Sequence, residues 1–435
     1  MGFAKLSVRF YGPFESADID LAPLTILTGP NVVGKSFLLR AIHAMFAPCV
    51  NGYPDVSSMI ARMCNDTIYT EPQYLSKLLF RGSKVLEIRL SDSGYNRGLR
   101  YNAETNKIES LDHDCTPSEA IFVSGARIYF TPYTYLRTEQ ITINTKPLTS
   151  IINEYARNVL EKVPGITSEE KERIIADIIK GFEEAKDTTT LVKALMRTSE
   201  ALNNIIEILS RQGVNIATAT RIRSFVIEAF NSLAFLYANP SLHDMIIMVK
   251  PILYRLDLNI EIGGIHKVKL HEIVKRADYI IREVLFPEVK QYNIALPGLS
   301  ESPSTIQLLP SSILHIYPLT IALVYVEKLA EKGAKVALLV EEPELGLDFK
   351  RQRMLAKHII SMIKKLRDSL IIAISTHSTE MLISLTKEAA EEEVKDYIKI
   401  YEILNRRAEE RTVTKSGAVY IKHMFEELAE IYGEI

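Results

Sequence analysis

LTILTGPNVVGKSFLLRAI (residues 24–42) decides the fold. Its first four residues form an apolar run typical of a buried strand, and from Ser36 onward apolar residues recur at helical spacing. Between them, GPNVVGKS (residues 29–36) fits the pattern G-x-x-x-x-G-K-[ST]. In this pattern glycines let backbone N–H groups point at phosphates, the lysine bridges the β- and γ-phosphates, and the hydroxyl binds Mg²⁺. A strand before the loop and a helix after it are the context that the motif requires, so we expect a phosphate-binding loop.

The loop and the first turn of its helix are the expected nucleotide contacts, because the helix aims its positive dipole end at the phosphates. These residues are Gly29, Pro30, Asn31, Val32, Val33, Gly34, Lys35, Ser36 and Phe37. We expect Ser36 to be a Mg²⁺ ligand as well.

A second apolar run, residues 335–340, ends in Glu341-Glu342-Pro343-Glu344. Such a run is typical of a central parallel strand, and open α/β sheets bind ligands beyond the carboxyl ends of their strands. Successive strand side chains point in opposite directions. We therefore expect Glu341 to reach Mg²⁺ through water and Glu342 to be the general base or water-orienting residue. The alternative is an acidic surface turn.

A third apolar run, residues 370–376, ends at His377. A polar side chain at that strand end lies at the same ligand edge, so we expect His377 to sense or hold the γ-phosphate. The alternative is a structural histidine.

Composition excludes several classes. The 435 residues carry 52 Lys and Arg against 54 Asp and Glu, a net charge of −2, which gives no support for nucleic-acid binding by bulk charge. Three cysteines without a CxxC pair exclude a disulfide scaffold or zinc finger. The start lacks the apolar core of a signal peptide, and the longest apolar stretch is too short to span a membrane. We expect a soluble, cytoplasmic protein with no membrane partner.

The chain divides by pattern into three parts. Residues 1–144 read as strands, the loop, a helix and a β-meander; residues 145–300 read as mainly helical, with a capping box at Thr167 and Glu170 and a hairpin over residues 258–270. Residues 301–435 return to alternating helix and strand. The prediction is an α/β fold: an N-terminal lobe (1–144), a helical insertion (145–300) and a C-terminal lobe (301–435).

These segments together resemble the ABC-type ATPase superfamily, and within it the SMC/RecF/OLD-like branch of AAA-type ATP-binding proteins. Residues 8–42 look like its N-terminal block, VALLVEEPELGLDFKRQ (336–352) like its Walker B motif and D-loop, and ISTHSTEML (374–382) like its His switch. The resemblance implies a P-loop ATPase head with a mixed central sheet flanked by helices. It also implies ATP and Mg²⁺ as cofactors, and a homodimer in which two heads sandwich two ATP molecules.

The resemblance implies further site residues. LLPSSILHIYPL (308–319) stands where a signature loop caps the γ-phosphate held by the partner head, which assigns that role to Ser311 and Ser312; a plain helix cap is the alternative. Asp348 would be the D-loop residue that reaches across the dimer. A Mg²⁺-carrying glutamine is also implied, with Gln140 the better candidate and Gln73 the other.

Two departures from the family pattern bear on turnover. Ser312 stands where glycine is usual, and Val32-Val33 stand where a small pair is common, although β-branched residues resist positive φ. The leading prediction is Mg²⁺-dependent ATP hydrolysis that drives or gates a separate effector, nuclease- or toxin-like, in DNA maintenance or defence. The departures favour the alternative, a nucleotide-gated DNA-, RNA- or protein-binding switch with little turnover. A kinase is the third alternative.

Overall fold

The computed structural model describes residues 4–47, 49–50, 53–64, 71–92, 95–113, 118–123, 141–144, 167–184, 257–262, 266–290 and 311–426, with isolated positions between 153 and 207. The chain forms two compact units. The first comprises residues 1–133, 279–292 and 310–435, and the second comprises residues 134–278 and 293–309.

One sheet of the first unit is antiparallel, with strand order β2-β1-β6-β7-β8. Its strands are β1 (Ala4–Tyr11), β2 (Phe14–Leu21), β6 (Val85–Asp92), β7 (Tyr95–Asn102) and β8 (Lys107–His113). Residues in β1 are alternately buried and more exposed, as expected for a strand with one face on a core. β6 and β7 agree with two of the three runs of the predicted β-meander, residues 84–92 and 98–104, whereas the third run, residues 126–132, lies outside the described residues. β8 pairs with β7 in a segment that was not predicted as a strand.

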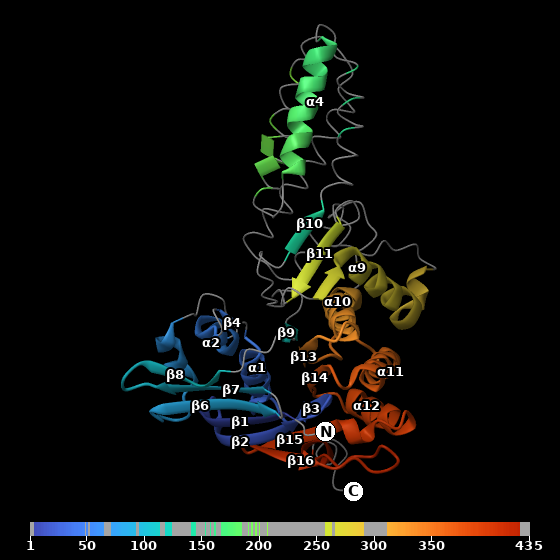
Figure 1. The fold of residues 1–435 in the computed structure, drawn as a ribbon. Helices are drawn as coiled ribbons and strands as arrows, with labels where there is room; N and C mark the ends of the chain where they lie inside the picture. Colours follow the sequence, from blue (N-terminus) through green and yellow to red (C-terminus); the bar gives the residue numbers. More distant parts are fainter. Residues whose placement is uncertain are drawn as a thin grey trace. The chain divides into compact units, whose positions relative to one another are not determined.

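The second sheet of this unit carries the phosphate loop. Its strand order is β16-β15-β3-β14-β13-β9, parallel throughout except for β16, and Figure 1 shows β3, β14 and β13 in its middle. The strands are β3 (Leu24–Thr28), β9 (Ser118–Val123), β13 (Lys335–Glu341), β14 (Leu370–Ser375), β15 (Ile398–Leu404) and β16 (Arg407–Arg411). The fully buried β3 has the continuous apolar character of a central parallel strand.

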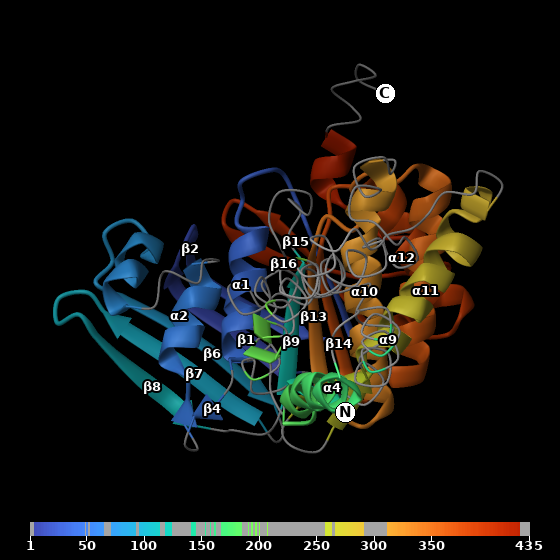
Figure 2. The ribbon, with the colours of Figure 1, turned by 90° about the horizontal axis from the view of Figure 1, so that it is seen from above.

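Helices cover both faces of this mixed sheet. Figure 2 shows α1 on one side of β9, β13 and β14, and α10, α11 and α12 on the other. The helices are α1 (Lys35–Met45), α10 (Ser311–Glu331), α11 (Phe349–Leu366) and α12 (Thr379–Glu391). This arrangement confirms the predicted α/β class with helices on both sides of a mixed central sheet.

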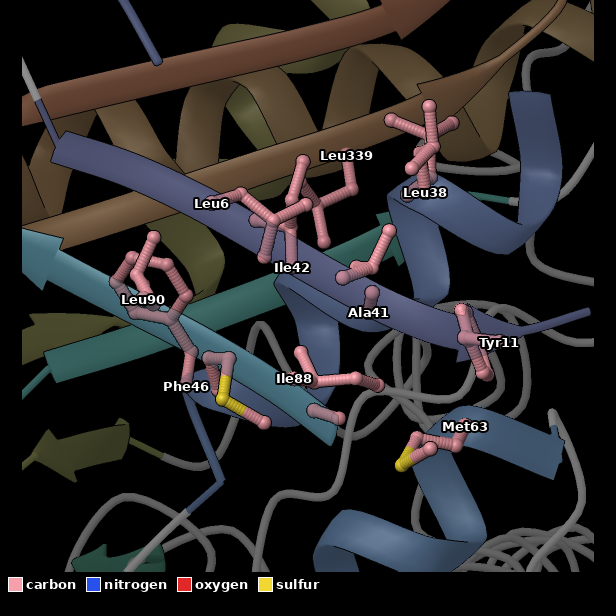
Figure 3. Packing of buried hydrophobic residues seen from close by; sticks show 14 of the residues in the cluster. Leu6, Tyr11, Leu38, Ala41, Ile42, Phe46, Met63, Ile88, Leu90 and Leu339 are labelled. Atoms are coloured by element: carbon pink, nitrogen blue, oxygen red, sulfur yellow. The ribbon is translucent and has the colours of Figure 1, made fainter. Parts of the chain in front are cut away.

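The core of the first unit lies between its two sheets, around α1. Leu38 and Ile42 of α1 pack in one buried cluster with Leu6 and Ile88 of the antiparallel sheet and Leu339 of β13 (Figure 3). All five side chains are excluded from solvent. The hydrophobic effect therefore fixes α1, and with it the phosphate loop, against both sheets.

The remaining elements of the first unit are short. They are β4 (Cys49–Val50), β5 (Tyr53–Pro54), α2 (Val56–Cys64), the 3₁₀ segments η1 (Pro72–Leu78), η4 (Pro287–Lys290) and η6 (Lys395–Tyr397), and the π-helical segment η3 (Ile280–Leu285).

The second unit holds a three-stranded antiparallel sheet, β10 (Ile141–Asn144), β11 (Asp257–Ile262) and β12 (His266–Lys269). Ile262 pairs with His266, which confirms the predicted hairpin. Helix α4 (Ser168–Glu183) begins with the predicted capping box, because the Thr167 hydroxyl accepts from the Glu170 N–H and the Glu170 carboxylate accepts from the Thr167 N–H. Helix α9 (Leu270–Tyr279) follows β12.

Candidate nucleotide-binding site

Three strand ends meet at one edge of the mixed sheet. Glu341 of β13 pairs with Ser375 of β14, and Ser375 pairs with Leu27 of β3. The segments that follow these strands therefore leave the sheet side by side. They are the phosphate loop, the turn that begins with Glu342, and the turn that contains His377.

The phosphate loop depends on its two fixed glycines. Gly29 and Gly34 have φ values of 137° and 114°, a conformation that residues with a Cβ rarely adopt. A Cβ at Gly29 would also collide with the carbonyl oxygen of Ile403, and one at Gly34 would lie 2.5 Å from Cγ of Pro13. The loop is thus a cradle formed by backbone atoms, and a side chain at Gly29 or Gly34 would not fit into it.

The first turn of α1 is available to an anion. Gly34 is the N-cap of α1, and no side chain caps the helix. The N–H groups of a helix's first turn have no partners within the helix, and they attract phosphate together with the helix dipole. The cradle and the uncapped helix start therefore fit the phosphates of a nucleotide.

Val32 adopts the conformation that its side chain disfavours. Its φ is 63° and its side chain is fully exposed, whereas Val33 packs against the core cluster. A β-branched residue in the left-handed region costs about 1–3 kcal/mol. The loop holds this strain at Val32, while Gly29 and Gly34 take up its other two positive φ values.

Lys35 lies at the centre of the site. Its ammonium donates to the carbonyl oxygens of Gly29 and Pro30, each at 2.7 Å, and its side chain is buried. Burial lowers the pKa of Lys35 to about 8, while the negative charges of Glu342 and Glu344 act in the opposite direction. The end of β13 therefore lies within electrostatic reach of the phosphate loop.

Glu342 has a strained backbone. Its φ is 47°, and its N–H donates to the carbonyl oxygen of Ser375 at 2.8 Å. The carboxylate Oε1 lies 3.9 Å from Nε2 of His377. A non-glycine residue held at positive φ between two strand ends is the kind of outlier that concentrates at functional sites.

His377 is half-buried near Lys35 and His423. Burial is the main cause that lowers its pKa to about 4, and the charges of Lys35 and His423 lower it further. The imidazole is therefore neutral around pH 7, with one ring nitrogen that donates and one that accepts.

The oxygen groups near the loop suit Mg²⁺ only with help from a nucleotide. Across the described residues, no group of three or more His, Cys, Asp or Glu side chains could hold a metal ion. Mg²⁺ is commonly bound by one or two carboxylates together with substrate phosphates and water. Ser36, in the first turn of α1, and Glu341, at the end of β13, offer the hard oxygen ligands of such a site.

Only one of the two candidate glutamines belongs to the described residues. Gln140 lies outside the described residues. Gln73 is exposed in η1, and its amide donates to the carboxylate of Glu71 at 2.7 Å. This contact is local, and no described contact joins Gln73 to the phosphate loop.

The predicted signature and D-loop residues lie at helix starts. Ser311 and Ser312 are the first two residues of α10, inside its first turn rather than ahead of it. Asp348 is the N-cap of α11, where its carboxylate accepts from the Arg351 N–H at 2.9 Å. A Cβ on Gly346 would lie 3.0 Å from Cδ2 of His315 of α10, so the D-loop turn packs against the start of this helix.

Two residues of this edge have contacts that sequence reasoning missed. Glu344 accepts hydrogen bonds from the turn after β14, and Gln352 of α11 joins the same turn to the D-loop. The E-E-P-E run hinted at Glu344, whereas Gln352 lies in an ordinary helical pattern without any distinguishing signal.

The fold and the site define a class of protein. In this chain a buried parallel strand leads into a glycine loop and a helix, and carboxylates lie at the end of a nearby strand. This arrangement is the one found in P-loop nucleotide-binding proteins. Residues 1–382 match the family described as AAA ATPase domain, and the chain belongs to this family. This result confirms the expected AAA-type ATP-binding protein. No curated protein matches the chain.

Several solved structures resemble the chain at low sequence identity. The Smc head domain of Pyrococcus furiosus, solved with an extended coiled coil bound to the C-terminal domain of ScpA, is 12% identical with a TM-score of 0.40, and the match covers 99% of each chain. The recombination mediator protein RecF is 12% identical with a TM-score of 0.36, over 94% of this chain and 98% of that one. The SMC head domain of Thermotoga maritima is 11% identical with a TM-score of 0.32, over 95% of this chain and 100% of that one.

None of the helices in the described residues is a candidate membrane span. Those helices lack the combination of length and apolar character that a bilayer span needs.

Proposed function

We propose that this protein hydrolyses ATP with Mg²⁺ at the edge formed by β3, β13 and β14. The observation that carries the proposal is the convergence of Lys35, Glu342 and His377, which come from three segments of the chain and interact electrostatically. A cation for the phosphates, a carboxylate for water and a neutral imidazole are the groups that phosphoryl transfer to water needs.

Each group has one proposed task. The N–H groups of the loop and the Lys35 ammonium bind the β- and γ-phosphates. Ser36 and Glu341 would hold Mg²⁺, which supplies positive charge that offsets the charge of the phosphate oxygens. Glu342 orients the attacking water and accepts a proton from it, and neutral His377 donates a hydrogen bond to the γ-phosphate.

We propose further that two heads close around ATP. Ser311 and Ser312 would cap the γ-phosphate held by the other head, and Asp348 would reach across the interface. Two large apolar side chains beside the site support this arrangement: Val32 at the loop tip is 100% exposed and Phe349, next to Asp348, is 68% exposed. A partner surface would remove both from water.

The three-part division of the chain belongs to the same proposal. Residues 1–144 and 301–435 form the two lobes of the head, and residues 145–300 form the insertion. The unit boundaries differ from this division at three places: residues 134–144 and 301–309 belong to the second unit, and residues 279–292 belong to the unit that holds the site. ATP-driven opening and closing would act on a separate effector, nuclease- or toxin-like, in DNA maintenance or defence.

ATP turnover with and without Mg²⁺ tests the proposal. Glu342→Gln should lower turnover by about 100-fold or more while ATP still binds, because the amide cannot accept a proton. Lys35→Ala should lose ATP binding. Glu391→Gln, on the exposed end of α12, is the matched control and should behave as the parent protein.

Other outcomes would contradict this function. ATP binding without turnover, in the presence and absence of DNA, would identify a nucleotide-gated switch. Transfer of phosphate to a compound in a metabolite mixture would identify a kinase.

A further inference from the structure

The third glutamate of the E-E-P-E segment faces the neighbouring strand end. One oxygen of Glu344, Oε1, accepts three hydrogen bonds: from the Thr376 hydroxyl at 2.8 Å, the His377 N–H at 3.1 Å and the Ser378 N–H at 3.2 Å. All three donors belong to the turn between β14 and α12. A carboxylate that gathers several donors in a partly buried place makes strong, charge-assisted hydrogen bonds.

A second connection joins the turn after β13, which contains Glu344, to the turn between β14 and α12. Ser378 donates from its hydroxyl to the Gln352 side-chain oxygen at 2.6 Å, and the Gln352 amide donates to the carbonyl oxygen of Leu347 at 2.9 Å. Gln352 is 6% exposed. Leu347 in turn donates its N–H to the carbonyl oxygen of Glu344 at 2.9 Å, so the contacts form a closed ring.

The ring fixes the segment that presents His377. Ser378 is the N-cap of α12, and its hydroxyl accepts from the Met381 N–H at 3.1 Å. The backbone N–H of His377 is held by Glu344, and the next residue is held by the helix cap and by Gln352. The backbone of His377 is thereby held at the place from which its imidazole lies 3.9 Å from Glu342.

We propose that Glu344 is a positioning residue that holds His377 against Glu342, and that Gln352 carries the state of the D-loop turn to the same histidine. The proposal rests on the hydrolytic function proposed above. A shift of the turn from Glu344 to Asp348, the segment assigned to the partner-facing D-loop, would move the acceptor of three hydrogen bonds. Closure of two heads would in this way change the orientation of His377.

Three variants test the role of Glu344 in turnover. Glu344→Ala removes the acceptor and should lower kcat by about tenfold or more, with the ATP dissociation constant changed less than about threefold because Lys35 and the loop remain. Glu344→Gln keeps an acceptor oxygen at the same place and should recover most of the rate. Glu391→Ala, on the exposed end of α12, is the control for loss of a glutamate.

A double-mutant cycle separates positioning from general destabilisation. If Glu344 acts through His377, Glu344→Ala should lower kcat less than about twofold further in a His377→Ala background. If the two substitutions lower kcat independently, so that the double variant shows the product of the two single effects, the proposal is overturned. Equal losses in Glu344→Ala and Glu344→Gln would overturn it too, because the charge and not the acceptor would then matter.

Amide hydrogen exchange without nucleotide gives a readout that does not depend on hydrolysis. In Glu344→Ala the N–H groups of His377 and Ser378 should exchange about tenfold faster or more, with the core of β14 unchanged. Gln352→Ala should speed exchange at Ser378. Unchanged exchange would refute the positioning role even if the parent protein hydrolyses ATP, whereas faster exchange in a protein without turnover would refute only the hydrolytic function.

Discussion

His377 and Glu342 lie 3.9 Å apart, Nε2 to Oε1, although 34 residues separate them in the chain. They meet because β13 and β14 are parallel neighbours in register, so that both carboxyl ends reach the same edge. The phosphate loop after β3 reaches this edge too. A water that Glu342 orients would therefore stand beside His377 and close to Lys35.

The protonation of His377 gives the first prediction. Its pKa in the folded protein is about 4, below the usual 6.5, chiefly because of burial. Between pH 6.5 and 4 the unfolded chain binds a proton that the folded chain does not, so the free energy of unfolding should fall as the pH falls through this window. Denaturant unfolding at several pH values should show a smaller fall in His377→Asn. Equal slopes in both proteins would contradict the assigned pKa.

Val32 gives a prediction about the loop itself. With φ at 63° and a fully exposed side chain, Val32 makes no packing contacts that would offset its backbone strain. Val32→Gly should raise the free energy of unfolding by up to about 1 kcal/mol, since relief of strain exceeds the flexibility that glycine adds to the unfolded chain. Thermal unfolding measures the change. A lower melting temperature would show that the valine stabilises the loop.

Gly34 should tolerate no side chain. A Cβ there would lie 2.5 Å from Cγ of Pro13, and φ is 114°. Gly34→Ala should lower the free energy of unfolding by about 2 kcal/mol or more and abolish ATP binding, because the loop cannot keep its shape. Gly333→Ala is the matched control: it has positive φ but open space around it. Similar losses of ATP binding in both variants would contradict the cradle.

A buried carboxylate behind the site gives a stability prediction. Glu402 of β15 is fully buried and accepts from the N–H and ring of His423, each at 2.8 Å, and from Nε of Arg411 at 2.7 Å. Burial alone would raise the pKa of Glu402, yet these donors hold it below its usual value. Glu402→Ala should cost about 3–5 kcal/mol, because it leaves Arg411 and His423 without their shared anion.

The control for that variant is Glu410→Ala. Glu410 pairs with Lys399 at the surface and its side chain is 45% exposed, so its loss should cost less than about 1 kcal/mol. Urea unfolding compares the two variants. If both variants lose a comparable free energy of unfolding, Glu402 contributes no more to stability than a carboxylate of a surface ion pair.

The sequence predicted the elements of the ATPase head whose signals are local. The spacing of Gly29 and Gly34 and the apolar runs of β3, β13 and β14 depend on chemistry within a few residues, and they predicted both the elements and their order. Residues 398–411 were not predicted as strands, although β15 and β16 form a hairpin with positive φ at Asn405 and Arg406. Such a turn is usually marked by glycine, and here it is not.

The contacts of the site were harder to predict than its residues. Glu344 was visible in the sequence, but its three donors lie more than 30 residues away, and only the register of β13 with β14 brings them together. Gln352 is one polar residue among many in α11, and its burial follows from the packing of helices on the sheet. Long-range packing of this kind leaves no periodic signal in a single sequence.

The molecular mass in solution of the Glu342→Gln variant shows whether it is a monomer or a dimer. Its measurement with and without ATP and Mg²⁺ tests the central claim most directly. If ATP joins two heads and Glu342 drives the hydrolysis that releases them, the variant should be a monomer without nucleotide and a stable dimer with ATP. The parent protein should return to the monomer as ATP is consumed. A variant that binds ATP and keeps the same mass under both conditions would contradict the account.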